Sequence, residues 1–326
     1  MNIKSKKLSL FILTIFTIMS LSCNGCMSFF GSTSSKKPTI PESISKGSGK
    51  EPELTVYIKD DEKIEKMNIE DYITGVVAGE MKNDWPVEAL AAQAILARTY
   101  VLEFIESKGG SKYGNAHIST DIEEAQAWDT ESINDRIREA VASTKGTVAS
   151  YKGDYIKAWF HAHSGGTTAT AKEGLAFKDK EPPYIKKVKS LDSDVGPEED
   201  RDWSAVYTRD EVRSLIKEKI GDDVGEVTSI EVTEKGPSGR AAIISVNGKD
   251  FPGADLRIAL GSSKMKSTLL SELKIDGEKV TMKGKGYGHG VGMSQWGANA
   301  MAERGDSPED IVKYYFKDID IIKLWD

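Results

Sequence analysis

Residues 69–102, IEDYITGVVAGEMKNDWPVEALAAQAILARTYVL, decide the fold of this chain. The first part of the stretch has the apolar spacing of an amphipathic helix. Asn68 stands where a capping residue is favoured, with Asp71 at the third helical position. We therefore predict that a first helix starts directly after Asn68.

Glu80 occupies the next position of the apolar stripe of this helix, so its carboxylate is expected to point toward the core. Gly75 and Gly79 leave room beside it for a backbone or a ligand. A desolvated carboxyl has a raised pKa and holds its proton near neutral pH, as a general acid must. The alternatives are a frayed helix end with Glu80 exposed, or a buried ion pair.

A second, longer helix is expected from Pro86 to about Ser107, where Gly109-Gly110 ends it. Arg98 lies within the apolar face of this helix. A buried arginine needs an acceptor, for which Glu80 or a substrate carboxylate would serve. The alternative is a purely structural ion pair.

The rest of the chain mixes the two kinds of element without regular alternation, and Lys152-Gly153-Asp154 is the expected turn of a hairpin. Strands are predicted over 54–58, 147–151, 155–163, 227–234, 241–246 and 319–324, and helices over 132–143, 209–220 and from Ser307 onward. This order indicates an α+β fold with antiparallel strands and argues against a doubly wound parallel sheet.

Composition excludes several classes of function. The chain has 326 residues, of which 39% are hydrophobic, so a sizeable core is expected. A net charge of −7 argues against capture of nucleic acid by bulk charge. Cys23 and Cys26 are the two cysteines, so the body of the chain has no disulfide, cysteine nucleophile or thiolate metal site.

The N-terminus has the pattern of an export signal. Lysines precede a 14-residue run, Leu8 to Leu21, whose length matches a secretory signal and is short for a membrane span. Ser22 before Cys23 resembles a bacterial lipoprotein cleavage site, with Cys23 lipidated. The alternatives are an uncut span over Leu8–Phe30, full release, or a reactive Cys23/Cys26 pair. We expect an extracytoplasmic protein anchored to the cell membrane.

These patterns divide the chain into three parts. Residues 1–23 are expected to be the signal peptide or membrane anchor, and 24–51 a flexible linker rich in Ser, Lys, Gly and Pro. Residues 52–326 are expected to form a single folded domain.

The histidines are few and grouped. His161 and His163 are expected on one face of the second hairpin strand, a geometry that binds metals when a third ligand is present. His117 or His289 would be that ligand. Without one, the pair forms a polar wall of a cleft. His289 itself lies in Gly286–Gly292, a glycine run that brings backbone amides close to a ligand and matches neither a dinucleotide fingerprint nor a P-loop.

Three segments together resemble the SpoIID/LytB family of sporulation and cell-wall proteins. They are Glu70–Tyr100 with its Val-Val-Ala-Gly-Glu-Met core, Phe160-His-Ala-His-Ser-Gly-Gly166, and Gly286-Tyr-Gly-His-Gly-Val-Gly-Met-Ser-Gln-Trp-Gly-Ala298. The resemblance covers most of 52–326 and implies a SpoIID-like catalytic domain.

The resemblance implies a lytic transglycosylase that cleaves between N-acetylmuramic acid and N-acetylglucosamine in peptidoglycan strands without stem peptides. Glu80 matches the family's catalytic acid/base. Hydrolases use two carboxylates, whereas a transglycosylase uses the sugar's own 6-hydroxyl and needs one. By resemblance, the glycan groove would be lined by Arg98, Tyr100, His163, Ser164, Tyr287, His289 and Gln295. Lys186, Lys187, Lys189, Lys283 and Lys285 are candidates to meet lactyl carboxylates.

Two departures from the family pattern bear on metals and substrate. Some members carry a His/Cys zinc cluster, but the similar stretch here, 124–128, has no cysteine, so no metal or other cofactor is expected. His163 stands where a threonine is common, which affects substrate contacts or a metal shared with His161. The competing function is a non-catalytic wall binder that enhances a cell-wall amidase, and such an amidase is a candidate partner.

Overall fold

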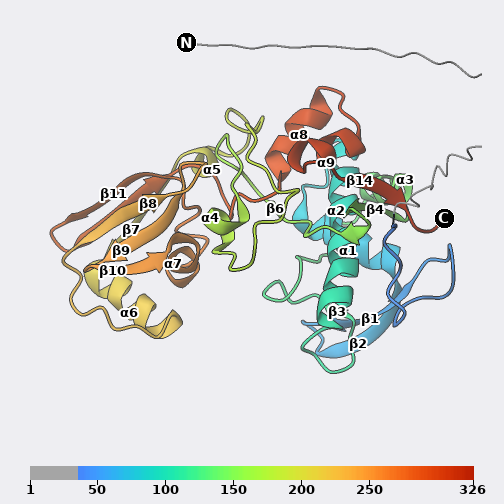
Figure 1. The fold of residues 1–326 in the computed structure, drawn as a ribbon, viewed down its shortest axis with the longest axis horizontal. Helices are drawn as coiled ribbons and strands as arrows, with labels where there is room; N and C mark the ends of the chain where they lie inside the picture. Colours follow the sequence, from blue (N-terminus) through green and yellow to red (C-terminus); the bar gives the residue numbers. More distant parts are fainter. Residues whose placement is uncertain (1–35) are drawn as a thin grey trace, which may run out of the picture. The chain divides into compact units, whose positions relative to one another are not determined.

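The computed structural model describes residues 36–326, which form one compact unit with two separate hydrophobic cores (Figure 1). The predicted signal or anchor, Cys23 and the start of the linker lie outside the described residues. Helices and predominantly antiparallel sheets make up the fold, which confirms the α+β class.

The first core is built around α2 (Val87–Lys108), whose residues are buried along most of its length. As predicted, α2 begins after Pro86 and ends at Gly109, which has φ 76°. α1 (Ile69–Glu80) packs beside it, together with α3 (Asp135–Ser143), α8 (Gln295–Glu303) and α9 (Pro308–Tyr315) (Figure 1). Asn68 precedes α1 as predicted, but its side chain makes no capping hydrogen bond.

Small sheets surround this core. β1 (Glu53–Ile58) pairs antiparallel with β2 (Lys63–Asn68) and parallel with β3 (Ile118–Ser119). β4 (Thr147–Tyr151) lies between β5 (Asp154–Tyr155) and β14 (Asp320–Lys323). β6 (Phe160–His161) pairs in parallel with β13 (Met293–Ser294), and this pairing brings two of the sequence motifs together.

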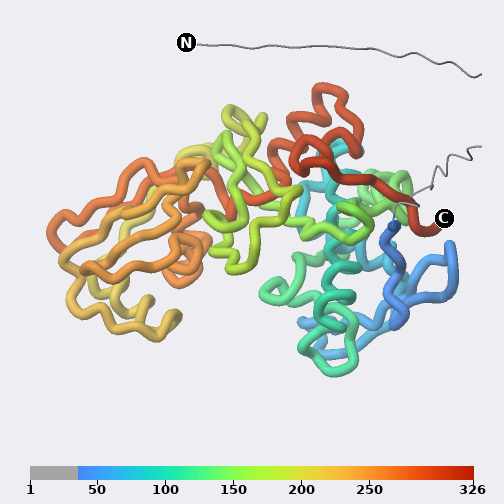
Figure 2. The backbone as a smooth tube through the Cα atoms, viewed as in Figure 1, coloured from blue at the N-terminus to red at the C-terminus, as the bar shows by residue number. Residues whose placement is uncertain are grey.

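The second core lies between two antiparallel three-stranded sheets and their helices. One sheet contains β8 (Ile230–Lys235), β9 (Ala241–Val246) and β10 (Lys249–Pro252), and the other β7 (Trp203–Thr208), β11 (Leu270–Asp276) and β12 (Lys279–Gly284). The helices are α6 (Arg209–Lys219), with the predicted Thr208–Glu211 capping box, and α7 (Gly253–Ala259). Figure 2 shows the chain entering this part and returning to the first core, and α4 (Ala171–Leu175) and α5 (Glu198–Arg201) lie on the outward path.

One predicted strand is wrong. Residues 155–163 were expected to continue a hairpin, but they divide into β5 and β6. The backbone turns at Lys157, whose N–H donates to the Tyr184 hydroxyl at 2.8 Å, while Trp159 N–H bonds back to the Lys157 carbonyl. As a result, β6 pairs with β13 rather than with β4, and His161 and His163 face different surroundings.

Part of the predicted linker lies against the folded body. Ile44 is buried, the Tyr155 hydroxyl donates to the Thr39 carbonyl at 3.1 Å, and Gly49 forms a bridge with Trp325. Between residues 36 and 326, no helix combines the length and the apolar character needed to cross a membrane.

A buried ion pair between Glu70 and Arg98 joins four segments of the first core. The Arg98 side chain is 0% exposed and donates to Glu70 Oε1 at 3.0 Å and Oε2 at 2.6 Å. Glu70 also accepts from Gly146 N–H and from Trp325 Nε1–H, each at 3.0 Å. The acceptor of Arg98 is therefore Glu70, and the expectation that Arg98 lines a substrate groove is wrong. The structural alternative is correct.

We predict that Arg98→Ala lowers the free energy of unfolding by about 3–5 kcal/mol, because it leaves the Glu70 carboxylate buried without its cation. Urea unfolding followed by circular dichroism measures the change. Lys313→Ala, which removes an exposed partner of Glu309 on α9, is the control and should cost less than about 1 kcal/mol. An Arg98→Ala effect as small as that of the control would contradict the account.

Candidate functional site

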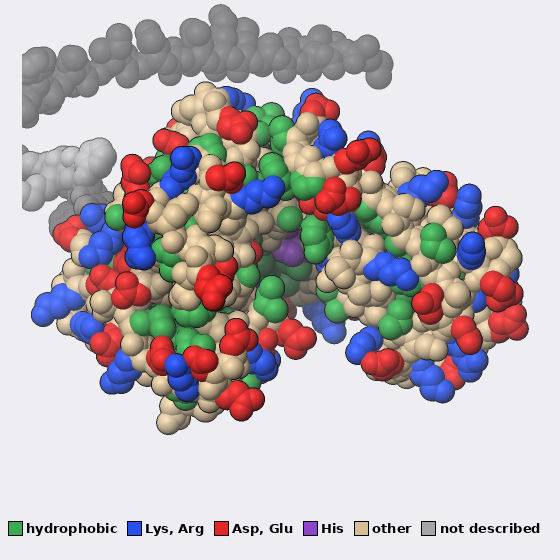
Figure 3. Space-filling model, turned by 180° about the vertical axis from the view of Figure 1, so that it is seen from behind, with side chains coloured by type: hydrophobic (Ala, Val, Ile, Leu, Met, Phe, Trp, Pro, Cys, Tyr) green, Lys and Arg blue, Asp and Glu red, His purple; other side chains and the backbone are tan. Residues whose placement is uncertain are grey.

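A cavity of about 720 Å³ brings together residues from both cores. Figure 3 shows a hollow on one face of the molecule, with histidine and hydrophobic surface inside it. The cavity is lined by the end of α1, the loop after β3, the segment around β6, the α7 helix, the glycine run and the start of α8. Glu80 is the one acidic residue among these described lining residues.

Glu80 is the last residue of α1, and it lies at the cavity wall, partly exposed. Burial is the main effect on it and raises its pKa above the usual value of a glutamate. Ala127 N–H donates to Oε1 at 2.8 Å and Gln295 Nε2–H to Oε2 at 3.3 Å, and both bonds oppose this rise. The carboxyl is therefore oriented at two atoms and biased toward its protonated form.

Two glycines on α1 allow the loop with Ala127 to approach Glu80. A Cβ on Gly79 would lie 2.7 Å from the backbone nitrogen of Trp128, and one on Gly75 would overlap the Trp128 indole. Any side chain at these positions would push the loop away and remove the Ala127 hydrogen bond. The sequence-based expectation that these glycines make room for a backbone is confirmed.

A buried carboxylate positions Gln295. Asp192 accepts hydrogen bonds from Ser164 N–H at 2.7 Å, Gly166 N–H at 2.9 Å and the Ser294 hydroxyl at 2.5 Å. Ser294 is the N-cap of α8, so this carboxylate holds the helix start that presents Gln295 to Glu80. Asp192 was not singled out in the sequence, where it lies in an acidic stretch.

The two cavity imidazoles are neutral, with tautomers set by their hydrogen bonds. His161 Nδ1–H donates to the Val291 carbonyl at 3.1 Å, which leaves Nε2 as an acceptor. His289 Nδ1 accepts from Val291 N–H at 3.0 Å. Burial lowers the pKa of His289 to about 3 and that of His161 well below the usual value. Gly288, at φ 110°, passes close to His161: a Cβ on residue 288 would lie 2.8 Å from the Cβ of His161.

The predicted site residues divide into two groups. Tyr100, Tyr287, His289 and Gln295 line the cavity with Glu80. His163 and Ser164 do not, because both are buried in hydrogen bonds elsewhere: His163 Nε2 lies 3.0 Å from the Val195 carbonyl, and the Ser164 hydroxyl donates to Asp192 at 2.8 Å. The expectation that these two residues contact substrate is wrong, and they support the cavity wall from behind.

The alternative role of His161 as a polar cleft wall fits its position, and His161 and His289 have ring centroids 5.6 Å apart. Within 36–326, no three His, Cys, Asp or Glu side chains gather closely enough to hold a metal ion.

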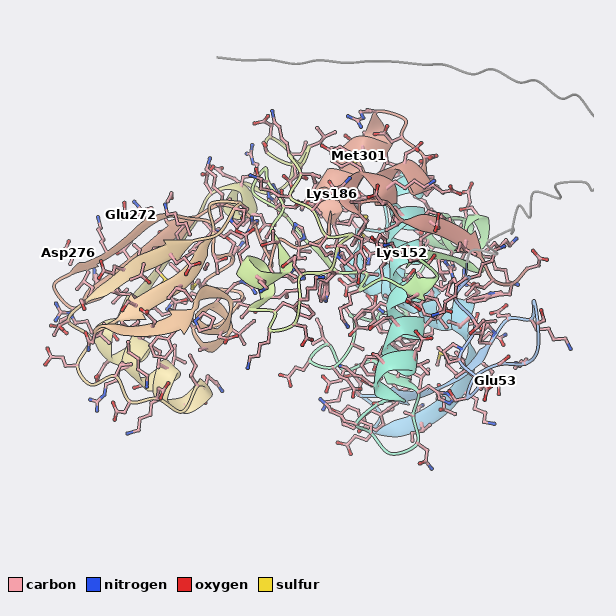
Figure 4. The ribbon with its side chains drawn as sticks, in the orientation of Figure 1. Glu53, Lys152, Lys186, Glu272, Asp276 and Met301 are labelled. Atoms are coloured by element: carbon pink, nitrogen blue, oxygen red, sulfur yellow. The ribbon has the colours of Figure 1, made fainter. Side chains whose placement is uncertain are left out.

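Most of the lysines proposed to meet carboxylates are engaged away from the cavity. Lys186, labelled in Figure 4, donates to the Lys313 carbonyl at 3.2 Å, and Lys187 donates to the Pro237 carbonyl at 3.0 Å. Lys283 pairs with Glu272, also labelled there, and Lys285 lies 3.6 Å from Asp202. None of the five lysines is among the lining residues, and that expectation is wrong.

The cationic residue that does line the cavity is Arg257 on α7. No motif marks it in the sequence, and it reaches the cavity only through packing of the second core.

Comparisons with known proteins identify the family. The model described as "Stage II sporulation protein" (SpoIID) matches residues 57–151, and one described as "Domain of unknown function (DUF8618)" matches 185–292. Stage II sporulation protein D of Bacillus amyloliquefaciens is 32% identical over 302 residues, 89% of this chain and 82% of its own length. Its counterpart in Bacillus subtilis (strain 168) is 32% identical over 81% of this chain and 77% of its own. The chain belongs to the SpoIID family.

A further relative, named an amidase enhancer in Bacillus subtilis (strain 168), is 31% identical over 75% of this chain. Only 39% of that longer protein is matched.

We predict that Glu80→Gln stabilises the folded protein at neutral pH. Folding raises the pKa of Glu80. The contribution of Glu80 to the free energy of unfolding is therefore fully present below the unfolded pKa, near 4.5, and is lost as the pH rises through the folded pKa. At pH 7 the free energy of unfolding of the variant should exceed that of the parent by about 1.4 kcal/mol for each pH unit by which folding raises the pKa of Glu80. At about pH 4 this difference should vanish.

Urea unfolding between about pH 4 and 8 measures this difference. Glu123→Gln, the same change at an exposed position of the neighbouring loop, should alter stability by less than about 0.5 kcal/mol. A variant that is less stable than the parent at pH 7, or a gain independent of pH, would show that Glu80 is not desolvated as described.

Proposed function

We propose that this protein is a lytic transglycosylase that cleaves the bond between N-acetylmuramic acid and N-acetylglucosamine in peptide-free glycan strands. The observation that carries the proposal is the single carboxyl in the cavity. Glu80 is held by two donors, biased toward protonation, and has no second acidic residue among the described lining residues. Hydrolases with paired carboxylates need both groups at the bond.

The proposed reaction needs one proton-transferring group. The protonated Glu80 donates its proton to the glycosidic oxygen as the bond from that oxygen to the muramic anomeric carbon breaks. The 6-hydroxyl oxygen of the same muramic residue then bonds to the anomeric carbon, and the Glu80 carboxylate accepts its proton. The products are a free 4-hydroxyl on N-acetylglucosamine and a 1,6-anhydro ring, and no water is consumed.

The protein residues around Glu80 suit both steps. Ala127 N–H and Gln295 Nε2–H stabilise the carboxylate once the proton has left, while burial favours its return. Tyr100, Trp159 and Tyr287 give the cavity aromatic surface against which sugar faces can pack.

We place this activity in sporulation or cell-wall remodelling, on the outer side of the cell membrane. Family membership supports the sporulation context. The N-terminal pattern supports attachment, either through lipid on Cys23 or through an uncut span. The second candidate function is enhancement of a cell-wall amidase without catalysis, which the similarity to the named amidase enhancer supports.

Product analysis tests the activity. The full chain in mild detergent is incubated with peptide-free strands, and soluble products are analysed by mass spectrometry. We predict fragments ending in 1,6-anhydro-muramic acid, lighter by one water than hydrolytic products. Glu80→Gln should reduce the rate at least about 100-fold, the typical contribution of a general acid, while Glu123→Gln keeps it.

Three results would contradict the proposal. Water-added reducing ends would identify a hydrolase. Equal product from Glu80→Gln would remove Glu80 from the chemistry. Stimulation of an amidase by the Glu80→Gln variant, with no cleavage by the parent chain, would favour the enhancer function.

A further inference from the structure

Arg257 is a buried cation at the wall of the Glu80 cavity. Its side chain comes from α7 in the second core, and the residue is 8% exposed. Nε–H donates to the Lys266 carbonyl at 2.9 Å and an Nη2–H to the Ser262 carbonyl at 3.4 Å. Burial lowers its pKa to about 10, so the guanidinium remains charged at neutral pH.

No carboxylate compensates this charge within 36–326. Arg257 forms no ion pair with any described residue. Its Nη1 donates no hydrogen bond to any described residue either. Burying a charge without a counter-ion is costly, and an arginine fork is suited to a carboxylate held by two parallel bonds. The free donors therefore point to an anionic group supplied from outside.

Arg240, a second buried arginine of the same region, also forms no ion pair among the described residues, and its Nε has no hydrogen-bond partner there. It is fully enclosed, and its guanidinium donates to the Thr167 carbonyl at 2.8 Å, the Ser238 hydroxyl at 3.0 Å and the Ser164 carbonyl at 2.6 Å. It is absent from the cavity lining, whereas Arg257 is part of it. The lack of an ion pair alone therefore does not mark a ligand site, and it is the position of Arg257 at the cavity wall that makes its guanidinium available to a ligand.

His161, another residue of the cavity lining, holds an unpartnered acceptor. His161 is 4% exposed, and its Nε2 has no hydrogen-bond partner among the described residues. Because Nδ1–H is committed to Val291, Nε2 accepts and does not donate. A hydroxyl group of a bound sugar would satisfy it, so the cavity offers a proton donor, a hydroxyl acceptor and a fixed cation.

We propose that Arg257 forms a carboxylate subsite that binds the free lactyl carboxylate of a muramic acid residue, while His161 Nε2 accepts a hydroxyl of the bound glycan. This inference rests on the proposed glycan-cleaving function and gives its substrate preference a physical cause. In a strand that carries peptides, this carboxyl is an amide without charge. Arg257 then loses its counter-ion, and the buried charge stays uncompensated.

The test compares two forms of one ligand. Soluble peptide-free strands are used as prepared, or after conversion of their lactyl carboxyls to methylamides with a carbodiimide. Binding is measured by calorimetry in the full chain carrying Glu80→Gln, which prevents turnover. We predict at least about tenfold tighter binding of the carboxylate form, the effect expected for one charged hydrogen-bonding pair.

In the same background, Arg257→Gln should lose this preference by weakening only the carboxylate form, and Arg257→Lys should retain part of it. The matched control is Lys279→Gln, which removes an exposed positive charge from β12, a strand that packs on the second core. This variant should keep the full preference for the carboxylate form.

Three outcomes overturn the subsite. They are a preference that survives Arg257→Gln, an equal loss for both ligand forms, which would indicate a structural role only, and a parent chain that binds both forms equally. If anhydro products still form in any of these cases, the transglycosylase stands and the subsite alone falls. A chain that binds neither form and yields no product overturns both.

Discussion

The Glu70–Arg98 ion pair is the interaction on which the rest of the structure depends. It locks the start of α1 to α2, to the turn before β4 and to the C-terminal Trp325. The two glutamates of α1 have opposite environments. Glu70 accepts from four N–H donors of the protein, whereas Glu80, ten residues further along the same helix, accepts from two and opens onto the cavity. The first fixes the helix and thereby sets the position of the second.

The cavity is assembled from segments that are far apart in the chain. Glu80, the Ala127 loop, His161, Arg257 and Gln295 come from five separate stretches, and short parallel pairing of β6 with β13 joins two of them. Close approach of backbones at glycines makes the assembly possible, as at Gly79 and Gly288. Because the second core contributes Arg257, it has a role in the site beyond its own stability. This gives physical content to the region matched by a domain of unknown function.

Helical periodicity alone was enough to single out Glu80, because an acidic residue on an apolar stripe is a local pattern. Motif resemblance added Tyr287, His289 and Gln295, whose place in the cavity follows from the glycine run and the helix start. The partner of Arg98 was not predicted: the sequence pattern suggested Glu80 or a substrate carboxylate, whereas packing selects Glu70 at the other end of the same helix. Arg257 and the Ala127 N–H carry no local signal: one depends on a second core, and the other is a backbone group on an irregular loop. The strand expected over 155–163 failed for a similar reason, since the turn at Lys157 is accompanied by a hydrogen bond to the distant Tyr184 hydroxyl.

One desolvated carboxyl, Glu80, and one uncompensated cation, Arg257, are proposed to act on the same glycan strand. A crystal structure of the Glu80→Gln chain with a peptide-free oligosaccharide tests it most directly. We predict that a glycosidic oxygen lies within hydrogen-bond distance of the residue 80 amide and that a lactyl carboxylate lies on the Arg257 guanidinium. A glycan seated outside this cavity, or one whose glycosidic oxygen lies away from residue 80, would contradict it.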